Sequence, residues 1–128
     1  RSINRHQWKL SALSSALDCS ASGHHAVFEA LKHLIALRKA QPAFHPNATQ
    51  FILHLGDALF GFWRQSLDGR QSLFCVHNLT SEEQVLALSR LNLMMNDRWW
   101  ELISGATVEK ELPEWTLAPY QTLWITNG

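Results

Sequence analysis

The sequence predicts a mainly β fold in which an antiparallel β-sandwich follows N-terminal helices. Before Pro42 the apolar residues recur at helical spacing, whereas short apolar runs separated by turn residues follow it. One of these turns contains Asp68-Gly69, and Asp-Gly between apolar runs is a strong hairpin signal because the turn needs a positive φ. The chain has 128 residues, 46% of them apolar and 17% charged, which suffices for one domain with a hydrophobic core.

Two helices are predicted before Pro42, a short one after Trp8 and a longer one over residues 25–39. Ser22 is a candidate cap for the longer helix, because its hydroxyl can accept a hydrogen bond from a free backbone N–H. Pro42 and Pro46 end the helix, since proline cannot donate the next backbone hydrogen bond. The two apolar stripes consist of Leu10, Leu13 and Leu17, and of Phe28, Leu31 and Ile35.

Seven or eight short strands are predicted after Pro46, and this number of strands with turns between them favours a β-sandwich. The segment over residues 89–97 has no clear period, so we expect a loop or a distorted edge there. The predicted strands cover residues 51–55, 59–64, 72–79, 84–88, 99–103, 107–109, 115–117 and 122–126.

Some of these strands are apolar on both faces. In the strand over residues 59–64, Phe60 and Phe62 alternate with Leu59 and Trp63. A sheet with one solvated face would instead alternate apolar and polar residues. We therefore expect that one sheet is covered, either by the N-terminal helix or by a further domain.

Charge and cysteine content exclude several classes. Eleven basic residues balance eleven acidic ones without a basic cluster, which argues against nucleic acid as a partner. No apolar run approaches the roughly 18 residues of a membrane span. Cys19 and Cys75 are predicted to be free thiols in a cytoplasmic protein, with Cys75 a small buried apolar residue. The chain begins without Met and without a signal peptide, so we expect a fragment of a longer protein.

The residue patterns contain no recognisable catalytic or metal centre. There is no GxSxG, HExxH or glycine-rich phosphate-binding motif. The carboxylates Glu82, Glu83, Glu109 and Glu111 fall in predicted turns or strand edges, where solvated faces are the ordinary interpretation. We therefore expect no catalytic residue, no cofactor and no metal in this chain, and whether it is an enzyme stays open. The seven histidines, which show no zinc-ligand spacing, are His6, His24, His25, His33, His45, His54 and His77.

The six tryptophans have two interpretations. Trp63 and Trp124 lie within apolar strands and are predicted to pack in the core. Trp99 and Trp100 point to opposite faces of a strand, so at most one of them lies inside. An exposed Trp99, Trp100 or Trp115 would offer a flat apolar surface to a sugar ring, which is the basis for an alternative function as a carbohydrate-binding module.

Four stretches of the sequence carry a resemblance to a known family. Residues 1–5 are similar to a Gly-Arg-x-Ile-Asn-Arg segment, and residues 34–46 contain a Leu-x-x-x-Arg-x-x-x-Pro-Ala-Phe pattern. Residues 76–80, which contain a Val-x-Asn pattern, and residues 117–125 are similar to two strands of a C-terminal domain. Together, in this order, they resemble the C-terminal region of the α-amylase family, glycoside hydrolase family 13, in its sucrose phosphorylase branch. The resemblance spans almost the whole chain.

The resemblance implies a division of the chain and a chemistry located elsewhere. Residues 1–45 would be the last helical part of a (β/α)8 barrel, and residues 46–128 an amylase-type Greek-key C-terminal domain. Enzymes of the family are retaining and use two barrel carboxylates, which would precede Arg1. In the phosphorylase branch, phosphate intercepts the glucosyl intermediate and gives glucose 1-phosphate. Arg1 matches the family's arginine near the glucosyl subsite and is the one candidate substrate-binding residue, whereas Asn4 and Arg5 are structural.

The expected function is therefore that of a structural accessory domain, inactive alone, whose partner is the catalytic barrel of the same polypeptide. The alternatives are a carbohydrate-binding module with a sugar ligand, and an interaction or oligomerisation domain that forms a homodimer. The sequence His45-Pro46-Asn47-Ala48 favours a glucosylglycerate or sucrose 6-phosphate enzyme over a sucrose enzyme. Donor, acceptor and the choice between phosphorolysis and hydrolysis stay open.

Overall fold

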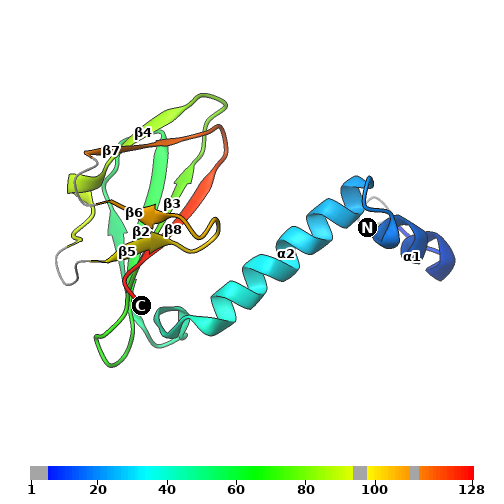
Figure 1. Ribbon diagram of the computed structural model, residues 1–128, viewed down its shortest axis with the longest axis horizontal. Helices are drawn as coiled ribbons and strands as arrows, with labels where there is room; N and C mark the ends of the chain where they lie inside the picture. Colours follow the sequence, from blue (N-terminus) through cyan, green and yellow to red (C-terminus); the bar gives the residue numbers. More distant parts are fainter. Residues whose placement is uncertain (1–5, 94–97, 110–112) are drawn as a thin grey trace. The chain divides into compact units, whose positions relative to one another are not determined.

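The computed structural model describes residues 6–93, 98–109 and 113–128 (Figure 1). The chain divides into two compact units, one up to Ala36 and the other over Leu37–Gly128. Helix α1 (Leu10–Asp18) lies in the first unit, α2 (Gly23–Ala40) crosses the boundary, and the strands lie in the second unit. The predicted division at residue 45 concerns the architecture of a larger protein and stays a prediction.

The helical unit forms as the sequence predicts but buries little of its own surface. Ser22 caps α2, since its Oγ accepts a hydrogen bond from the backbone N–H of His24 at 3.1 Å. His25 Nδ1 bonds the carbonyl oxygen of Leu17 and so links α2 to α1. Neither helix contains a buried residue. The exposed apolar side chains of this unit are Trp8, Leu10, Val27, Phe28, Leu31 and Ile35. Among the described residues, no helix is long and apolar enough to cross a membrane.

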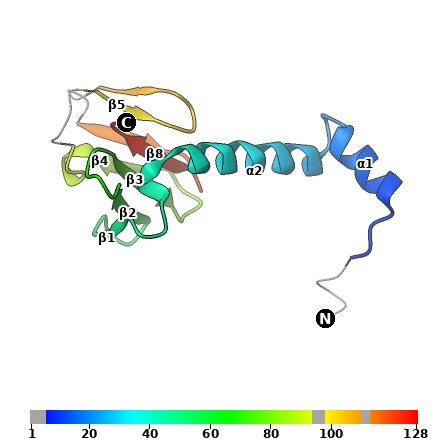
Figure 2. The same ribbon diagram turned by 90° about the horizontal axis from the view of Figure 1, so that it is seen from below.

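The second unit is an antiparallel sandwich of two unequal sheets, which confirms the predicted fold class. The larger sheet has the order β1-β2-β3-β8-β5-β6, and β4 pairs with β7 in the smaller one. In Figure 2, β1 and β5 lie on opposite sides of the sandwich with β3 and β8 between them. The strands are β1 (Thr49–Leu53), β2 (Leu59–Gln65), β3 (Ser72–Asn78), β4 (Gln84–Ala87), β5 (Trp99–Glu101), β6 (Thr107–Val108), β7 (Glu114–Leu117) and β8 (Thr122–Thr126).

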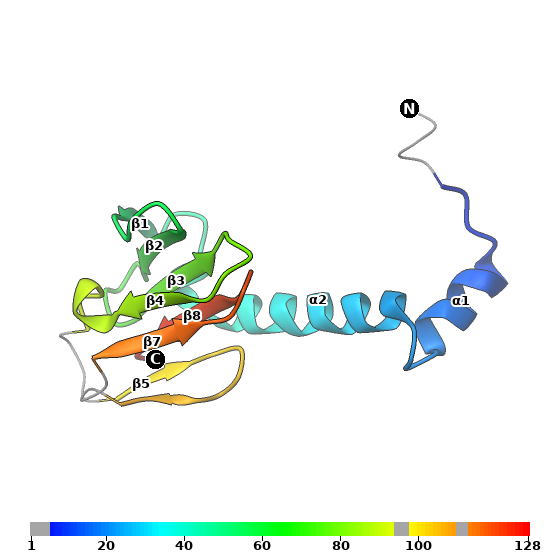
Figure 3. The ribbon, with the colours of Figure 1, turned by 90° about the horizontal axis from the view of Figure 1, so that it is seen from above.

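The main hydrophobic core lies between the two sheets. Figure 3 shows the β4–β7 pair in front of β3 and β8. Alternate residues of these strands belong to one cluster of buried side chains. A series of aromatic rings crosses this core: Phe51 stacks on Trp63 at 5.0 Å, Trp63 on Phe74 at 6.0 Å, and Phe74 lies 5.6 Å from Trp99. The buried core residues are Leu59, Phe74, Val76, Leu86, Leu88, Leu91, Trp99, Val108, Leu117, Leu123 and Ile125.

Two predictions about irregular segments concern the turn at Asp68-Gly69 and the segment over residues 89–97. The β2–β3 hairpin turns at Asp68-Gly69 as predicted, with Gly69 at a φ of 70°. In the segment over residues 89–97, residues 89 and 90 belong to the 3-10 helix η2 (Leu88–Arg90). Residues 91–93 form neither helix nor strand, as expected of a loop, and Leu91 lies in the core. Residues 94–97 lie outside the described residues.

The two cysteines are free, as predicted, with Cys19 exposed and Cys75 buried. Burial raises the pKa of the Cys75 thiol to about 12, because the charged thiolate would lose its hydration. Cys75 therefore behaves as a small apolar core residue.

Candidate functional site

Glu101 is the one buried carboxylate among the described residues. Its hydrogen bonds argue against a catalytic role. Glu101 Oε1 accepts from the backbone N–H groups of Ile103 at 3.1 Å and Trp124 at 2.9 Å. Its Oε2 accepts from the N–H and the hydroxyl of Ser104, at 2.7 and 2.6 Å. With both oxygens engaged, Glu101 fastens the turn after β5 to β8. No group of three or more His, Cys, Asp or Glu in the described part of the chain could hold a metal ion.

The predicted substrate-binding residue, Arg1, lies outside the described residues, as do Asn4, Arg5 and Glu111. The role of Arg1 stays a prediction.

The structure excludes Trp99 as one of the tryptophans that could bind a sugar ring. Trp99 is only 1% exposed and lies in the core, so it cannot offer its ring to a ligand. Trp100, on the opposite face of β5, and Trp115 are half-buried. Trp63 and Trp124 pack against the two hydrophobic clusters, as predicted. The sequence shows that Trp99 and Trp100 face opposite ways, but which of them points inward depends on the strand's neighbours.

The segment between α2 and β1 is anchored to the sheet by Arg64 of β2, a role that the sequence analysis missed. Arg64 Nε donates to the carbonyl oxygen of Ala43 at 2.8 Å, and Nη2 donates to that of His45 at 2.8 Å. Arg64 Nη1 also donates to Gln50 Oε1 at 2.9 Å. A single arginine in an otherwise apolar strand was the available signal, since a guanidinium can satisfy several carbonyls at once.

Gln71, which is 5% exposed, provides a second anchor. Its Oε1 accepts from the N–H of Ala43 at 2.8 Å, and its Nε2 donates to Gln41 Oε1 at 2.6 Å. The same Nε2 also donates to the carbonyl oxygen of Gly128. The 3-10 helix η1 (Pro42–Phe44) and the C-terminal residue are thus fixed to one side chain.

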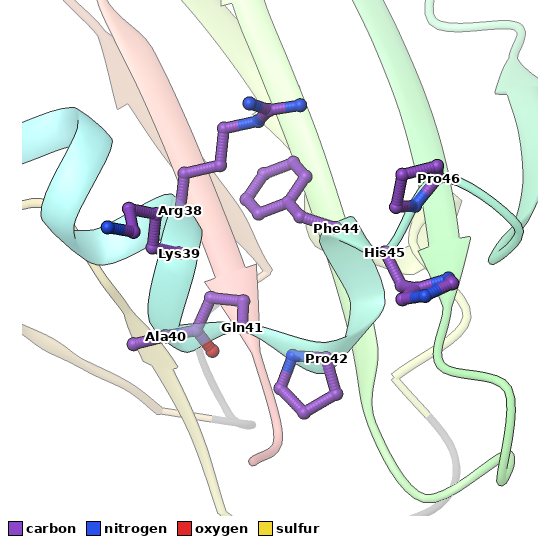
Figure 4. A pocket seen from close by; sticks show the side chains of 8 residues that line it. All are labelled: Arg38, Lys39, Ala40, Gln41, Pro42, Phe44, His45 and Pro46. Carbon is purple, nitrogen blue, oxygen red and sulfur yellow. The ribbon is translucent and has the colours of Figure 1, made fainter.

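A pocket of about 390 Å³ lies beside this anchored segment (Figure 4). The Arg38 guanidinium lies over the Phe44 ring at 5.8 Å, and Figure 4 shows Lys39 and His45 directed to opposite sides. A specific small-ligand site needs a few polar groups that converge on one point, and these do not. The pocket is lined by Arg38, Lys39, Ala40, Gln41, Pro42, Phe44, His45 and Pro46.

The strongest candidate for a functional surface is the face of the larger sheet turned away from β4 and β7. Strand alternation places Phe60, Phe62, His77 and Trp124 there, because their neighbours in sequence point into the main core. We call these four residues the aromatic face. The ring centroids of Phe60 and Phe62 lie 5.9 and 6.0 Å from that of His77, and the Trp124 ring lies 5.0 Å from Phe44 of η1.

The aromatic face is only partly covered. Ala43, Phe44 and Leu102 pack on Leu73 and Cys75, which lie on this face of β3 at the end near Trp124. Phe60 remains 43% exposed, and Phe62, His77 and Trp124 are half-buried. The larger sheet is therefore apolar on both faces, and η1 covers part of the second face. That the N-terminal helix or a further domain covers this face stays a prediction.

Two exposed side chains lie at the same end of the sheet as Phe60. Leu79, 61% exposed, follows β3, and its N–H donates to the carbonyl oxygen of Ala58 at 3.0 Å. Tyr120, 69% exposed, precedes β8 and has a φ of 58°, which is uncommon for a residue with a side chain. A hydrogen bond from its N–H to the carbonyl oxygen of Thr80 at 3.2 Å helps to hold this conformation.

His77 makes the stability of this face depend on pH. Burial lowers the pKa of His77 below the ordinary 6.5, because the imidazolium would lose hydration beside two phenyl rings. The unfolded chain therefore binds this proton at higher pH than the folded chain. We expect the free energy of unfolding to be unaffected above 6.5 and to fall as the pH drops below it. Urea unfolding between about pH 7.5 and about pH 5.5 measures this.

His77→Phe is expected to reduce that pH dependence, since phenylalanine keeps the ring stack and removes the titrating group. His54→Phe, at an exposed histidine, is the matched control and should keep it. An unchanged pH dependence in His77→Phe would contradict the assignment.

No family model matches the chain. It is 31% identical over 127 residues to the glucosylglycerate phosphorylase of Allomeiothermus silvanus, a match that covers 99% of this chain and 20% of that enzyme. It is 28% identical to the glucosylglycerate phosphorylase of Escherichia coli, covering 98% of this chain and 21% of the enzyme. The chain is similar to one fifth of a glycoside phosphorylase.

Solved structures agree on the fold. AmyP in complex with maltose matches with a TM-score of 0.67 and 15% identity, over 80% of this chain and 20% of AmyP. At this identity the match shows the fold alone, a mainly β amylase-type C-terminal domain with helices before it. In both comparisons the chain spans about one fifth of the length of the protein it matches.

Proposed function

We propose that this chain is the C-terminal accessory domain of a retaining glycoside phosphorylase of the α-amylase family, in its sucrose phosphorylase branch. The observation that carries the proposal is the match over 99% of the chain to 20% of a glucosylglycerate phosphorylase. The sequence of residues 45–48 favours a glucosylglycerate or sucrose 6-phosphate enzyme, which agrees with this match. We include a cytoplasmic location in the proposal, because the two free thiols are consistent with it.

In this proposal the aromatic face docks on the catalytic barrel of the same polypeptide. Burying apolar surface stabilises an interface by roughly 25 cal/mol per Å², and Phe60, Phe62 and Trp124 supply such surface. The exposed stripe of α2, around Phe28 and Leu31, would pack in the barrel wall. The barrel would supply the two carboxylates, and phosphate would release the glucosyl group as glucose 1-phosphate. The domain's own contribution is to support the barrel.

A chimera tests the proposal. The matching fifth of the Allomeiothermus silvanus enzyme is replaced by this chain, and phosphorolysis of glucosylglycerate and the thermal midpoint are measured. We expect the chimera to be active, and Phe60→Asp to lower its midpoint and its yield of active enzyme. Val85→Asp is the matched control, because Val85 is 55% exposed on β4 in the other layer.

Thermal unfolding of the isolated chain carrying each substitution shows whether the domain itself still folds. An inactive chimera, or equal effects of Phe60→Asp and Val85→Asp, would count against the proposal. The coding sequence upstream of Arg1 gives a second test. An in-frame barrel with an Asp nucleophile and a Glu acid/base supports it, and the absence of one overturns it.

A further inference from the structure

Strand β1 forms an open edge of the larger sheet, on the side away from β5 and β6. Among the described strands it pairs only with β2, in an unbroken register from Thr49 opposite Gln65 to Leu53 opposite Gly61. Phe51 is 49% and Ile52 55% exposed. Edge strands are usually protected by Lys, Pro or a bulge, because their free N–H and C=O groups can pair with another strand. The sequence Thr-Gln-Phe-Ile-Leu of β1 contains none of these.

Phe51 is also the outer end of the ring series that crosses the core through Trp63, Phe74 and Trp99. Its inner side stacks on Trp63 with an interplanar angle of 23°, and about half of its surface remains exposed. A ring held at this edge favours an aromatic or β-branched partner on a neighbouring strand.

We propose that β1 pairs with β1 of a second copy of this chain, antiparallel about a twofold axis at Phe51. Thr49 then lies opposite Leu53 of the other copy, Gln50 opposite Ile52, and Phe51 opposite itself. A twofold interface requires a self-complementary surface. Strand β1 carries no charge that would face its like across the axis, and the chain's formal net charge of zero leaves no overall repulsion between copies.

Strand β1 adjoins the aromatic face, because Ile52 lies opposite Phe62. The inference still does not depend on the proposed function, since the pairing uses the free backbone groups of β1 and not the rings of the aromatic face. The opposite edge strand, β6, offers fewer backbone groups for pairing, because it is only two residues long. The pairing would join the larger sheets of two copies into one continuous sheet.

Sedimentation equilibrium of the 128-residue chain, in a Cys19→Ser background that prevents disulfide-linked association, tests the proposal. We expect a concentration-dependent dimer. Ile52→Lys should raise its dissociation constant by about tenfold or more, because pairing would desolvate an uncompensated ammonium group. Val85→Lys is the matched control: Val85 and Ile52 are both 55% exposed, but β4 lies in the smaller sheet.

A trapping experiment tests the register. Phe51→Cys in the same background should give a covalent dimer on mild oxidation, since directly opposed residues of antiparallel strands lie within disulfide reach. Val85→Cys should not. The proposal is overturned by a chain that stays monomeric at all concentrations, or by a dimer with the same dissociation constant after Ile52→Lys. It is equally overturned by a dimer that Phe60→Asp weakens as much as Ile52→Lys does, because Ile52 lies opposite Phe62 and such a dimer would use the aromatic face.

Discussion

Asn78→Asp is expected to lower the free energy of unfolding by about 3–5 kcal/mol. Asn78 is 2% exposed at the end of β3. Its Nδ2 donates to the carbonyl oxygens of Glu82 at 2.7 Å and Ala118 at 2.9 Å, and its Oδ1 accepts from the N–H and hydroxyl of Thr80. Aspartate has the same shape, but it would turn a buried charged oxygen toward two carbonyl oxygens.

Urea unfolding near neutral pH measures this loss, with Asn47→Asp at an exposed asparagine as the control. The control should change stability by less than about 0.5 kcal/mol. The deficit of Asn78→Asp should shrink in acid, because a protonated carboxyl can again donate to a carbonyl oxygen. Equal stabilities of the two variants at neutral pH would show that Asn78 does not hold the turns together.

Glu101→Ala is expected to cost about 2–4 kcal/mol of the free energy of unfolding. Four donors, from Ile103, Ser104 and Trp124, lose the carboxylate that they share. A buried donor left without a partner costs more than an ordinary hydrogen bond contributes, so the effect exceeds that of one lost contact.

Thermal and urea unfolding measure the cost, and Glu83→Ala at an exposed glutamate is the matched control. Backbone amide exchange adds a local measurement, since the N–H groups of Ile103 and Ser104 should lose protection first. A variant whose stability equals that of Glu83→Ala would contradict the role assigned to Glu101.

Local sequence patterns predicted most of the strands, because a short apolar run between turn residues is visible in the sequence of the strand itself. The bounds of β8 agree, and those of β2 and β3 differ by one residue. The start of β1 at Thr49 was missed, since Thr49 and Gln50 are polar and join the strand only through pairing with β2. Pairing partners lie far apart in sequence and leave no local signal.

The polar anchors were harder to predict for the same reason. Asn78 entered the sequence analysis only as part of a motif, although its partners lie as far away as Ala118. Gln71 contacts Gln41 and Gly128 at opposite ends of the sandwich unit's sequence. A polar residue of this kind is indistinguishable in sequence from a solvated one until the strands around it are placed. The aromatic face was foreseen because Phe60 and Phe62 lie in one short strand.

The position of β8 has a consequence for the synthesis of the protein. Strand β8 (Thr122–Thr126) is the last described strand along the chain, yet it lies between β3 and β5 and is bonded to both. A ribosome that has delivered β1 to β7 has therefore released two separate parts of a sheet with no strand to join them. The larger sheet can close only after residues 122–126 leave the exit tunnel. Folding of this sandwich is thus expected to be a late event, slowed by the long sequence separation of its central pairs.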